Sequence, residues 1–383
     1  MSVEFPPRGF IFWPVGCGDS TTIKVNDNVV MQVDIHHLAS ADDDDTPVHP
    51  VVDSLVEMLP TKDGDDKPYL AVFALTHADQ DHCKGFAELL ERVSIGELWF
   101  SPRVIRDYED NAELCDDAAA FCTEANRRIA LNQGVEADSG DRIRIIGSDD
   151  ILDEDAYKNI PAARKSKPGD NVTVLDGVDL DGTFRAFLHS PFGDDSTRER
   201  NKTSLGMQIT LSEGDYFGRV MLLGDLDYPP LRRVFVEHED PENTAWDVLL
   251  APHHCSKSAM YYQDDGDDEP VLKQDLLDAM ARTAGKTGWV LASSTKVPAT
   301  DTAGANPPHA LAKARYDEIA PNGFLCTGDD ENSDDPIVFE VNADGISLVS
   351  GVADTGTSKA AAAIDGSRGG SQPHSTTVGF GRR

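Results

Sequence analysis

Four residues with side chains that bind metal ions follow a short apolar run. Residues 69–75 are apolar and lead directly into four potential ligands: His77, Asp79, Asp81 and His82. His77 and Asp79 are two positions apart, so in an extended segment their side chains point the same way. Imidazole and carboxylate groups together suit zinc, manganese or iron. The stretch is a candidate metal-binding loop, and the alternative is an acidic loop that happens to contain histidines.

Two later apolar runs also end in potential ligands. Residues 220–227 read VMLLGDLD, and Asp225 follows a glycine that lets the backbone approach other groups closely. A carboxylate at a strand end can bridge two ions. Residues 248–258 read VLLAPHHCSKS and present His253 and His254. Taken singly, the first is also compatible with an ordinary turn, and the second with two partly buried loop histidines.

A fourth stretch precedes these three. Residues 15–25 read VGCGDSTTIKV, in which the glycines predict a tight turn between two strands. Its Asp19 either belongs to a simple hairpin or contacts the edge of the site. Three strand ends that carry histidine and aspartate in a fixed order are much less expected by chance than any one of them, so we predict one shared centre.

The four stretches resemble one known family. THADQDH, LLGD and APHHCSKS, preceded by VGCGDS, resemble the metallo-β-lactamase superfamily, and most closely its branch of ComEC-type competence-protein hydrolase domains and their stand-alone relatives. The resemblance extends over roughly residues 9–350. It implies an α+β fold, a four-layer αββα sandwich, with the site at one edge between the two sheets.

The resemblance also implies a set of ligands for two divalent metal ions, zinc or manganese. The superfamily motif usually reads H-x-H-x-D-H, and here an aspartate replaces the second histidine, as is common in the ComEC branch. The implied ligands are His77 and Asp79 for the first ion, Asp81, His82 and His253 for the second, and Asp225 as the bridge.

The first ion is one ligand short in this scheme. The superfamily normally supplies another histidine from the segment that corresponds to residues 198–209, but this segment contains none and resembles the Asn-rich motif of the ComEC branch. Asn201 and Ser204 stand there instead. For His189, upstream, we expect a structural or site-edge role rather than that of the missing ligand, and His309 either faces the substrate or begins a helix. We therefore expect the first metal site to be incomplete.

Two divalent cations would activate a water molecule for attack on a carbonyl or phosphorus centre. Asp81 would hold and orient this water, and His254 and Lys257 would offset the charge that develops on the attacked group. The leading hypothesis is a phosphodiesterase or nuclease-type hydrolase that acts on nucleic acid or nucleotides, on the strength of the ComEC resemblance alone. The alternatives are hydrolysis of an amide, ester or lactone bond, and a non-catalytic metal-binding scaffold or interaction protein.

Short strands and helices alternate along the chain, as two packed sheets with helices outside require. Continuously apolar segments predict strands that are buried on both faces, and apolar residues at helical spacing predict amphipathic helices. The segments that define this pattern are strands at 9–15, 21–25, 28–34, 69–76, 218–225 and 246–254, and helices at 49–59, 110–133 and 308–320.

The composition predicts one large domain with two unusual parts. Residues 1–350 are expected to form the hydrolase domain. Within it, the polar, Asp-rich sequence of residues 103–170 is expected to be an acidic and helical insertion or an elaborated connection. Residues 351–383 are rich in Gly, Ser and Ala without apolar periodicity, so they are expected to be a disordered tail.

The net charge of -34 limits the kinds of molecule that this protein is expected to bind. It fits either life in a salt-rich cytoplasm or a very acidic cytosolic protein. In both cases the negative electrostatic field of the protein repels nucleic acid and anionic membranes. A small nucleotide is therefore a better-suited substrate than long DNA.

The cysteines and the apolar segments indicate the compartment. Six cysteines without a C-x-x-C pair predict free thiols in a reducing environment. No stretch approaches the roughly 20 apolar residues that a membrane span needs, and we recognise no signal peptide. We expect a cytoplasmic protein without a membrane partner.

Overall fold

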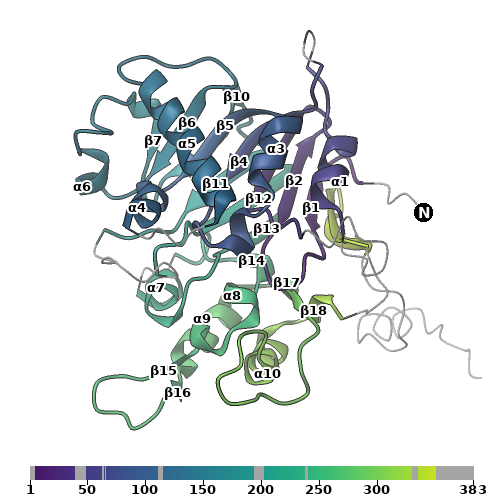
Figure 1. Cartoon of the computed structure of the whole chain (residues 1–383). Coiled ribbons are helices and arrows are strands. Elements are labelled where there is room, and N and C mark those ends of the chain that lie inside the picture. The colour runs from purple at the N-terminus through teal and green to yellow at the C-terminus, as the bar shows by residue number, and fades with distance from the viewer. Residues whose placement is uncertain are drawn as a thin grey trace, which may run out of the picture. The chain divides into compact units, whose positions relative to one another are not determined.

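The computed structural model describes residues 5–38, 49–62, 64, 66–110, 115–193, 202–237, 240–329 and 335–350. Asn201 and the expected tail at 351–383 lie outside these residues, so both remain predictions. The described elements form two large sheets with helices on their outer faces (Figure 1).

The first sheet has nine strands, and its middle and one end are parallel. Strands β3 to β7 run parallel to one another, whereas β20, β19, β1 and β2 are antiparallel neighbours. In spatial order the strands are β20 (Gly345–Ser350), β19 (Ile337–Asn342), β1 (Gly9–Phe12), β2 (Thr21–Asn26), β3 (Val29–Val33), β4 (Tyr69–Ala74), β5 (Ser94–Phe100), β6 (Arg142–Ile146) and β7 (Lys165–Ser166).

The second sheet has seven strands, and β13, β14, β17 and β18 are its parallel part. In spatial order the strands are β18 (Gly323–Gly328), β17 (Ala284–Thr295), β14 (Trp246–Leu250), β13 (Tyr216–Leu222), β12 (Met207–Glu213), β11 (Phe184–Leu188) and β8 (Asn171–Val172). Two small hairpins pair β9 (Val174–Leu175) with β10 (Val178–Asp179), and β15 (Tyr261–Tyr262) with β16 (Val271–Leu272).

Alternating side chains along each central strand fill two different apolar layers. In β1, Phe10 and Phe12 point into the layer between the sheets, and Ile11 points to the opposite face. In β14, Val248 belongs to the layer between the sheets, and Leu249 to the layer behind the second sheet. Successive strand side chains face opposite ways, so a continuously apolar strand is one buried on both faces.

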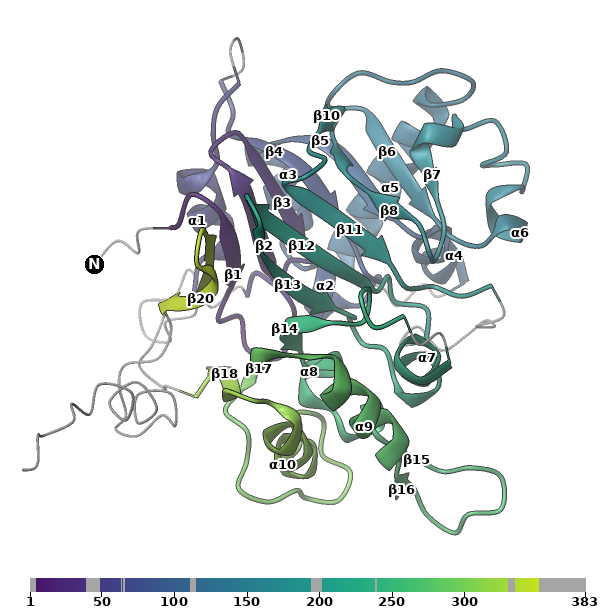
Figure 2. The ribbon, with the colours of Figure 1, turned by 180° about the vertical axis from the view of Figure 1, so that it is seen from behind.

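Helices cover the outer face of each sheet, which completes the four layers (Figures 1 and 2). The apolar layer behind the first sheet is closed by helices near it in sequence, and the layer behind the second sheet by later helices. The helices of the first set are α1 (Val51–Met58), α2 (Gln80–Cys83), α3 (Phe86–Arg92), α4 (Pro102–Asp110), α5 (Asp116–Leu131) and α6 (Asp149–Leu152), and those of the second are α7 (Tyr228–Arg232), the π-helical η4 (Arg233–Glu237), α8 (Pro252–Cys255), α9 (Gln274–Thr283) and α10 (Ala310–Ile319). The expected αββα sandwich is confirmed.

Residues 103–170 contribute more strands to the first sheet than their polar sequence predicts. They hold most of α4, all of α5 and α6, and also β6 and β7, which lengthen the first sheet in parallel. Ile143 and Ile145 of β6 are fully buried. Whether this segment is an insertion relative to other proteins stays a prediction, but it is built into the sandwich.

The parallel strands set the position of the site. β3 and β4 run parallel in one sheet, and β13, β14 and β17 in the other, so within each sheet their carboxyl ends lie at one edge. Loops at the carboxyl ends of parallel strands are where α/β folds usually bind ligands. Among the described residues, no helix is both long and apolar enough to cross a membrane.

The aromatic contacts of Phe121 predict how strongly α5 is bound to the first sheet. Its ring packs 6.1, 5.0 and 5.7 Å from the ring centres of Phe73, Phe86 and Phe100. We expect Phe121→Ala to lower the free energy of unfolding by about 3–5 kcal/mol, because it leaves a cavity in this layer. Urea unfolding measures the change. The exposed Leu131 of the same helix is the control, and an equal loss for Leu131→Ala would contradict the packing described here.

Candidate metal centre

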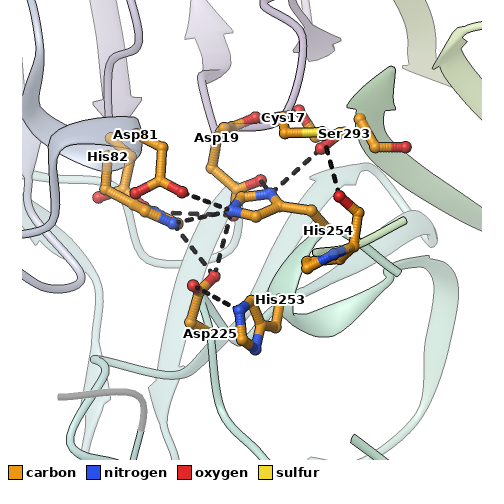
Figure 3. A network of polar contacts seen from close by, with 12 residues as sticks. Cys17, Asp19, Asp81, His82, Asp225, His253, His254 and Ser293 are labelled. Atoms are coloured by element: carbon orange, nitrogen blue, oxygen red, sulfur yellow. Dashed lines mark hydrogen bonds and ion pairs between the residues drawn. The ribbon is translucent and has the colours of Figure 1, made fainter. Parts of the chain in front are cut away.

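Three strand ends deliver the histidines and aspartates to one place (Figure 3). The segment after β4 supplies Asp81 and His82, the segment after β13 supplies Asp225, and the segment after β14 supplies His254. Each of these four side chains offers a ligand atom, and the four atoms all lie within 4.8 Å of one another. The group is thus a cluster that could hold a metal ion, and it includes His254, which the sequence analysis did not count among the ligands.

Asp225 occupies the middle of the cluster, with its two oxygens directed to different partners. Its Oδ1 lies 3.1 Å from Nε2 of His82 and 3.4 Å from Nε2 of His254. Its Oδ2 lies 3.7 Å from Nε2 of His77 and 3.6 Å from Nε2 of His253. The carboxylate therefore faces one pair of imidazoles with each oxygen.

The two neighbouring histidines lie differently from the expected arrangement. We expected His253 to join Asp81 and His82, and His254 to face the reacting group. Instead, Nε2 of His254 lies 3.4 Å from Oδ2 of Asp81 and 3.2 Å from Nε2 of His82. His253 approaches Asp225 from another side (Figure 3), on the oxygen that also faces His77.

An unusual backbone turn explains why His253 and His254 lie differently from the expected arrangement. His253, His254 and Cys255 have φ values of 52°, 52° and 67°, all in the left-handed region that residues other than glycine rarely adopt. Each such residue costs of order 1–3 kcal/mol and persists only when its surroundings fix it. The turn lets two successive side chains enter the site in different directions, which an extended loop would not do.

Hydrogen bonds from two other segments hold this turn. The N–H of His253 donates to the carbonyl of Gly224 at 3.0 Å. The N–H of His309 donates to the carbonyl of Cys255 at 3.1 Å, and its ring Nδ1 accepts from the N–H of Lys257 at 3.3 Å. His309 directly precedes α10 and is buried. Its contacts are those of a residue that supports the turn.

The imidazole nitrogens that point into the cluster are better placed to bind a cation than to form hydrogen bonds with one another. Nε2 of His77 is buried without a hydrogen bond to any described residue. Asp79 Oδ2 and Asp225 Oδ2 lie 3.6 and 3.7 Å from it, too far for a hydrogen bond. The Nε2 atoms of His82 and His254 face each other at 3.2 Å. Converging imidazole and carboxylate atoms match the ligands of zinc or manganese, so the residues fit a metal centre.

The outer nitrogen of each imidazole is engaged by the surrounding fold. Nδ1 of His77 lies 3.3 Å from the hydroxyl of Ser204, and Nδ1 of His82 lies 2.8 Å from Oδ2 of Asp34. Nδ1 of His254 donates to the carbonyl of Ser293 at 3.1 Å. Partners of this kind orient metal-binding histidines and leave Nε2 for the ion.

Buried carboxylates and imidazoles shift each other's pKa in opposite directions. Burial alone would lower the pKa of His82, but the carboxylates of Asp225 and Asp34 outweigh it and hold this pKa well above its ordinary value. Burial alone would raise the pKa of Asp225, but His254 and His82 hold it well below the ordinary value. Without metal, protons on His82 and His254, whose pKa values are both raised by the carboxylates, therefore balance the buried negative charge. A bound cation would replace them, so metal affinity should fall as the pH falls.

Asp34 is a functional residue that the sequence analysis missed. It follows β3, is buried, and has a φ of 54°. Its carboxylate accepts hydrogen bonds from the N–H and the hydroxyl of Thr76 at 2.8 and 2.7 Å, besides facing His82. The signal was present in the sequence, because an aspartate ends the apolar segment 28–34, as Asp225 ends another.

The remaining candidates lie around the cluster. Oδ1 of Asp19 lies 3.4 Å from Nδ1 of His254, and its N–H donates to the carbonyl of Asp81 at 3.0 Å. Lys257 follows the turn on η5 (Lys257–Ala259), and no ion pair joins it to a described carboxylate. Nε2 of His189 lies 3.0 Å from the carbonyl of Asn243, and among the described residues His189 belongs to none of the groups that could hold a metal.

Comparisons with known proteins add a weak likeness of fold. Neither a protein-family model nor a curated protein matches the chain. Among solved structures, the chain is similar to zinc-bound PqqB from Methylobacterium extorquens, with 12% identity and a TM-score of 0.30, over 61% of this chain and 58% of PqqB. It thus spans less than two thirds of the PqqB chain.

Two further structures have similar scores. The short form of human tRNase Z shares 13% identity over 74% of this chain and 91% of its own, with a TM-score of 0.36. The subclass B3 metallo-β-lactamase BJP-1 of Bradyrhizobium japonicum shares 15% identity over 73% and 89%, with a TM-score of 0.33. At these scores the likeness is too weak to assign an activity, and the site must be judged from its own geometry.

The contact between Asp34 and His82 predicts an effect on metal binding. We expect Asp34→Asn to weaken zinc binding by about 10–100-fold, because the neutral amide holds the imidazole less firmly. Asparagine tolerates the left-handed backbone, so the fold should persist. Competition with a chromogenic chelator measures the affinity. The exposed Asp27→Asn is the matched control, and equal affinities for both variants would rule out this role of Asp34.

Proposed function

We propose that this protein is a hydrolase that uses two divalent cations. The observation that carries the proposal is the position of Asp225, whose two oxygens face separate pairs of imidazoles at 3.1 to 3.7 Å. A carboxylate shared in this way is expected where two cations lie side by side. A scaffold with one structural ion needs no such bridge.

Each cation has its own set of ligands in this proposal. The sets follow the two sides of Asp225 and revise the roles expected of the neighbouring histidines. We assign His77, Asp79, His253 and Asp225 Oδ2 to the first cation, and Asp81, His82, His254 and Asp225 Oδ1 to the second. With His253 on its side, the first cation gains the ligand that the sequence alone did not provide.

The exposure of the ligands indicates how a substrate reaches the centre. The side chain of Asp81 is 37% exposed and that of His253 is 21% exposed, whereas His77, His82 and Asp225 are almost fully buried. Solvent therefore reaches the centre at Asp81, His253 and Asp79, the last of which is 23% exposed. A substrate that enters there would meet the ligands of both cations.

The chemistry of the centre is hydrolysis by an activated water. Two divalent cations, when bound, would activate a water molecule and polarise the bond under attack. Asp81, whose carboxylate is more exposed than those of Asp79 and Asp225, would accept a hydrogen bond from that water and orient it. Lys257, next to the turn, would offset negative charge on the attacked group.

The substrate that we propose is a phosphodiester in a nucleotide or a short nucleic acid. The resemblance of the four motifs to ComEC-type hydrolase domains supports this choice. The net charge of -34 favours a small substrate over long DNA. Six cysteines without a disulfide support our expectation of a reducing, cytoplasmic location.

Removal of the Asp225 carboxylate should prevent both cations from binding. We expect Asp225→Asn to lose both cations and about 10³-fold or more in kcat, because several kcal/mol of charge stabilisation are lost. Elemental analysis and a phosphodiesterase assay measure the two effects. Asp215→Asn, on the exposed turn between β12 and β13, is the matched control. Wild-type metal content in Asp225→Asn would refute the assignment.

A panel of substrates tests the reaction class. We expect the manganese- or zinc-loaded protein to cleave a chromogenic phosphodiester and cyclic dinucleotides, and to act on long single-stranded DNA mainly at high salt, where the repulsion is screened. RNA, a chromogenic ester, a lactone and a β-lactam complete the panel. Hydrolysis of only the last three would favour the amide, ester or lactone alternative. Inertness of the fully loaded protein towards all of them would favour a scaffold.

A further inference from the structure

Two cysteine side chains meet directly behind the metal centre. The Sγ atoms of Cys83 and Cys115 lie 3.5 Å apart, although the residues are 32 positions apart in the chain. Cys83 is the last residue of α2 and directly follows His82. Cys115 directly precedes α5. The contact therefore joins the helix that carries two proposed ligands to the start of the long helix that covers the first sheet.

Other hydrogen bonds hold the segments that carry these two cysteines. The N–H of Ala87, in α3, donates to Oδ1 of Asp117, in the first turn of α5, at 2.9 Å. The N–H of Cys83 donates to the carbonyl of Asp79 at 3.2 Å within α2. A bond between the two sulfurs would thus join segments that are neighbours in the folded state and needs no rearrangement of the sheets.

The two thiols differ in their access to solvent and in their acidity. Cys83 is fully buried, whereas Cys115 is half-buried. The pKa of Cys115 is lowered to about 6, chiefly by the hydrogen bond from the Cys83 thiol and also by N–H groups in the first turn of α5. An accessible thiol of low pKa with a second thiol behind it is the usual arrangement of a redox-sensitive pair.

We propose that Cys83 and Cys115 form a reversible disulfide when the protein meets a peroxide, and that this disulfide weakens metal binding. The thiolate of Cys115 attacks one peroxide oxygen, so an S–O bond forms, the O–O bond breaks, and the departing hydroxide takes a proton. The thiol of Cys83 then attacks the resulting sulfenic acid, the S–S bond forms, and hydroxide leaves with the proton of Cys83 as water. Two thiols and one hydrogen peroxide give one disulfide and two waters.

The position of Cys83 couples this bond to the centre. A disulfide needs its sulfurs about 2.05 Å apart, so Cys83 and Cys115 must approach each other from their present 3.5 Å. α2 spans only Gln80–Cys83 and contains Asp81 and His82, so a shift of its last residue moves their side chains. This part of the proposal rests on the proposed function, whereas disulfide formation does not.

The first experiment tests the disulfide. The full-length chain, reduced and freed of metal, is treated with hydrogen peroxide and analysed by intact and tryptic mass spectrometry. We expect a loss of two hydrogen atoms and a cross-link between tryptic peptides 63–84 and 107–127. Peptide 107–127 contains both Cys115 and Cys122, so variants must identify the partner. Cys115→Ser should lose the cross-link, and Cys122→Ser, on the same helix, should keep it.

Two outcomes of this first experiment would contradict the proposed disulfide. Separate oxygen additions without a cross-link, or a cross-link that persists in Cys115→Ser, would overturn the proposed pair. Cys115→Ala replaces the serine variant if circular dichroism shows that the latter is misfolded.

The second experiment measures zinc affinity by chelator competition, before oxidation, after it, and after reduction with dithiothreitol. We expect about tenfold weaker binding in the oxidised protein, full recovery on reduction, and no change in treated Cys115→Ser. A complete disulfide with unchanged affinity would overturn the coupling. The zinc affinity of the untreated, reduced chain tests the proposed metal centre separately, so the two failures are distinguishable.

Discussion

Buried negative charge at the edge between the two sheets is the constraint on which the site depends. Asp225, Asp34 and Asp19 are each at most 5% exposed. A carboxylate so far from water is costly unless positive charge or hydrogen-bond donors surround it. The fold meets this requirement with imidazoles from two separate strand ends and with donors such as Thr76. The same arrangement brings together side chains that could hold a metal ion.

The sandwich fixes the cluster through the outer nitrogens of the imidazoles. Asp34 at the end of β3, Ser204 before β12 and Ser293 in β17 each approach one Nδ1. Ser293 belongs to a strand, Asp34 directly follows one and Ser204 lies three residues before one, so the sheets largely set their positions. A site supported by rigid elements keeps its inward-facing atoms in place before a ligand arrives.

Much of this arrangement could be predicted from the sequence. Continuous apolar segments predicted the doubly buried strands, and ligands at three strand ends predicted one centre. The roles of His253 and His254 were assigned differently from the sequence, because their left-handed turn depends on hydrogen bonds with Gly224 and His309, which are distant or unremarkable in sequence. Strand β6 was missed because charged residues flank its short apolar core. Asp34 was missed because a single aspartate after a strand is common.

The left-handed turn also has a consequence for how metal is acquired. Adjacent residues of one turn approach the two oxygens of Asp225, so each proposed cation takes one ligand from the same short piece of backbone. Capture of the first ion would restrain this already held turn further and thereby keep the neighbouring ligand more firmly in place for the other ion. The two cations would then bind with positive cooperativity, and partly loaded molecules would be scarce at intermediate metal concentrations.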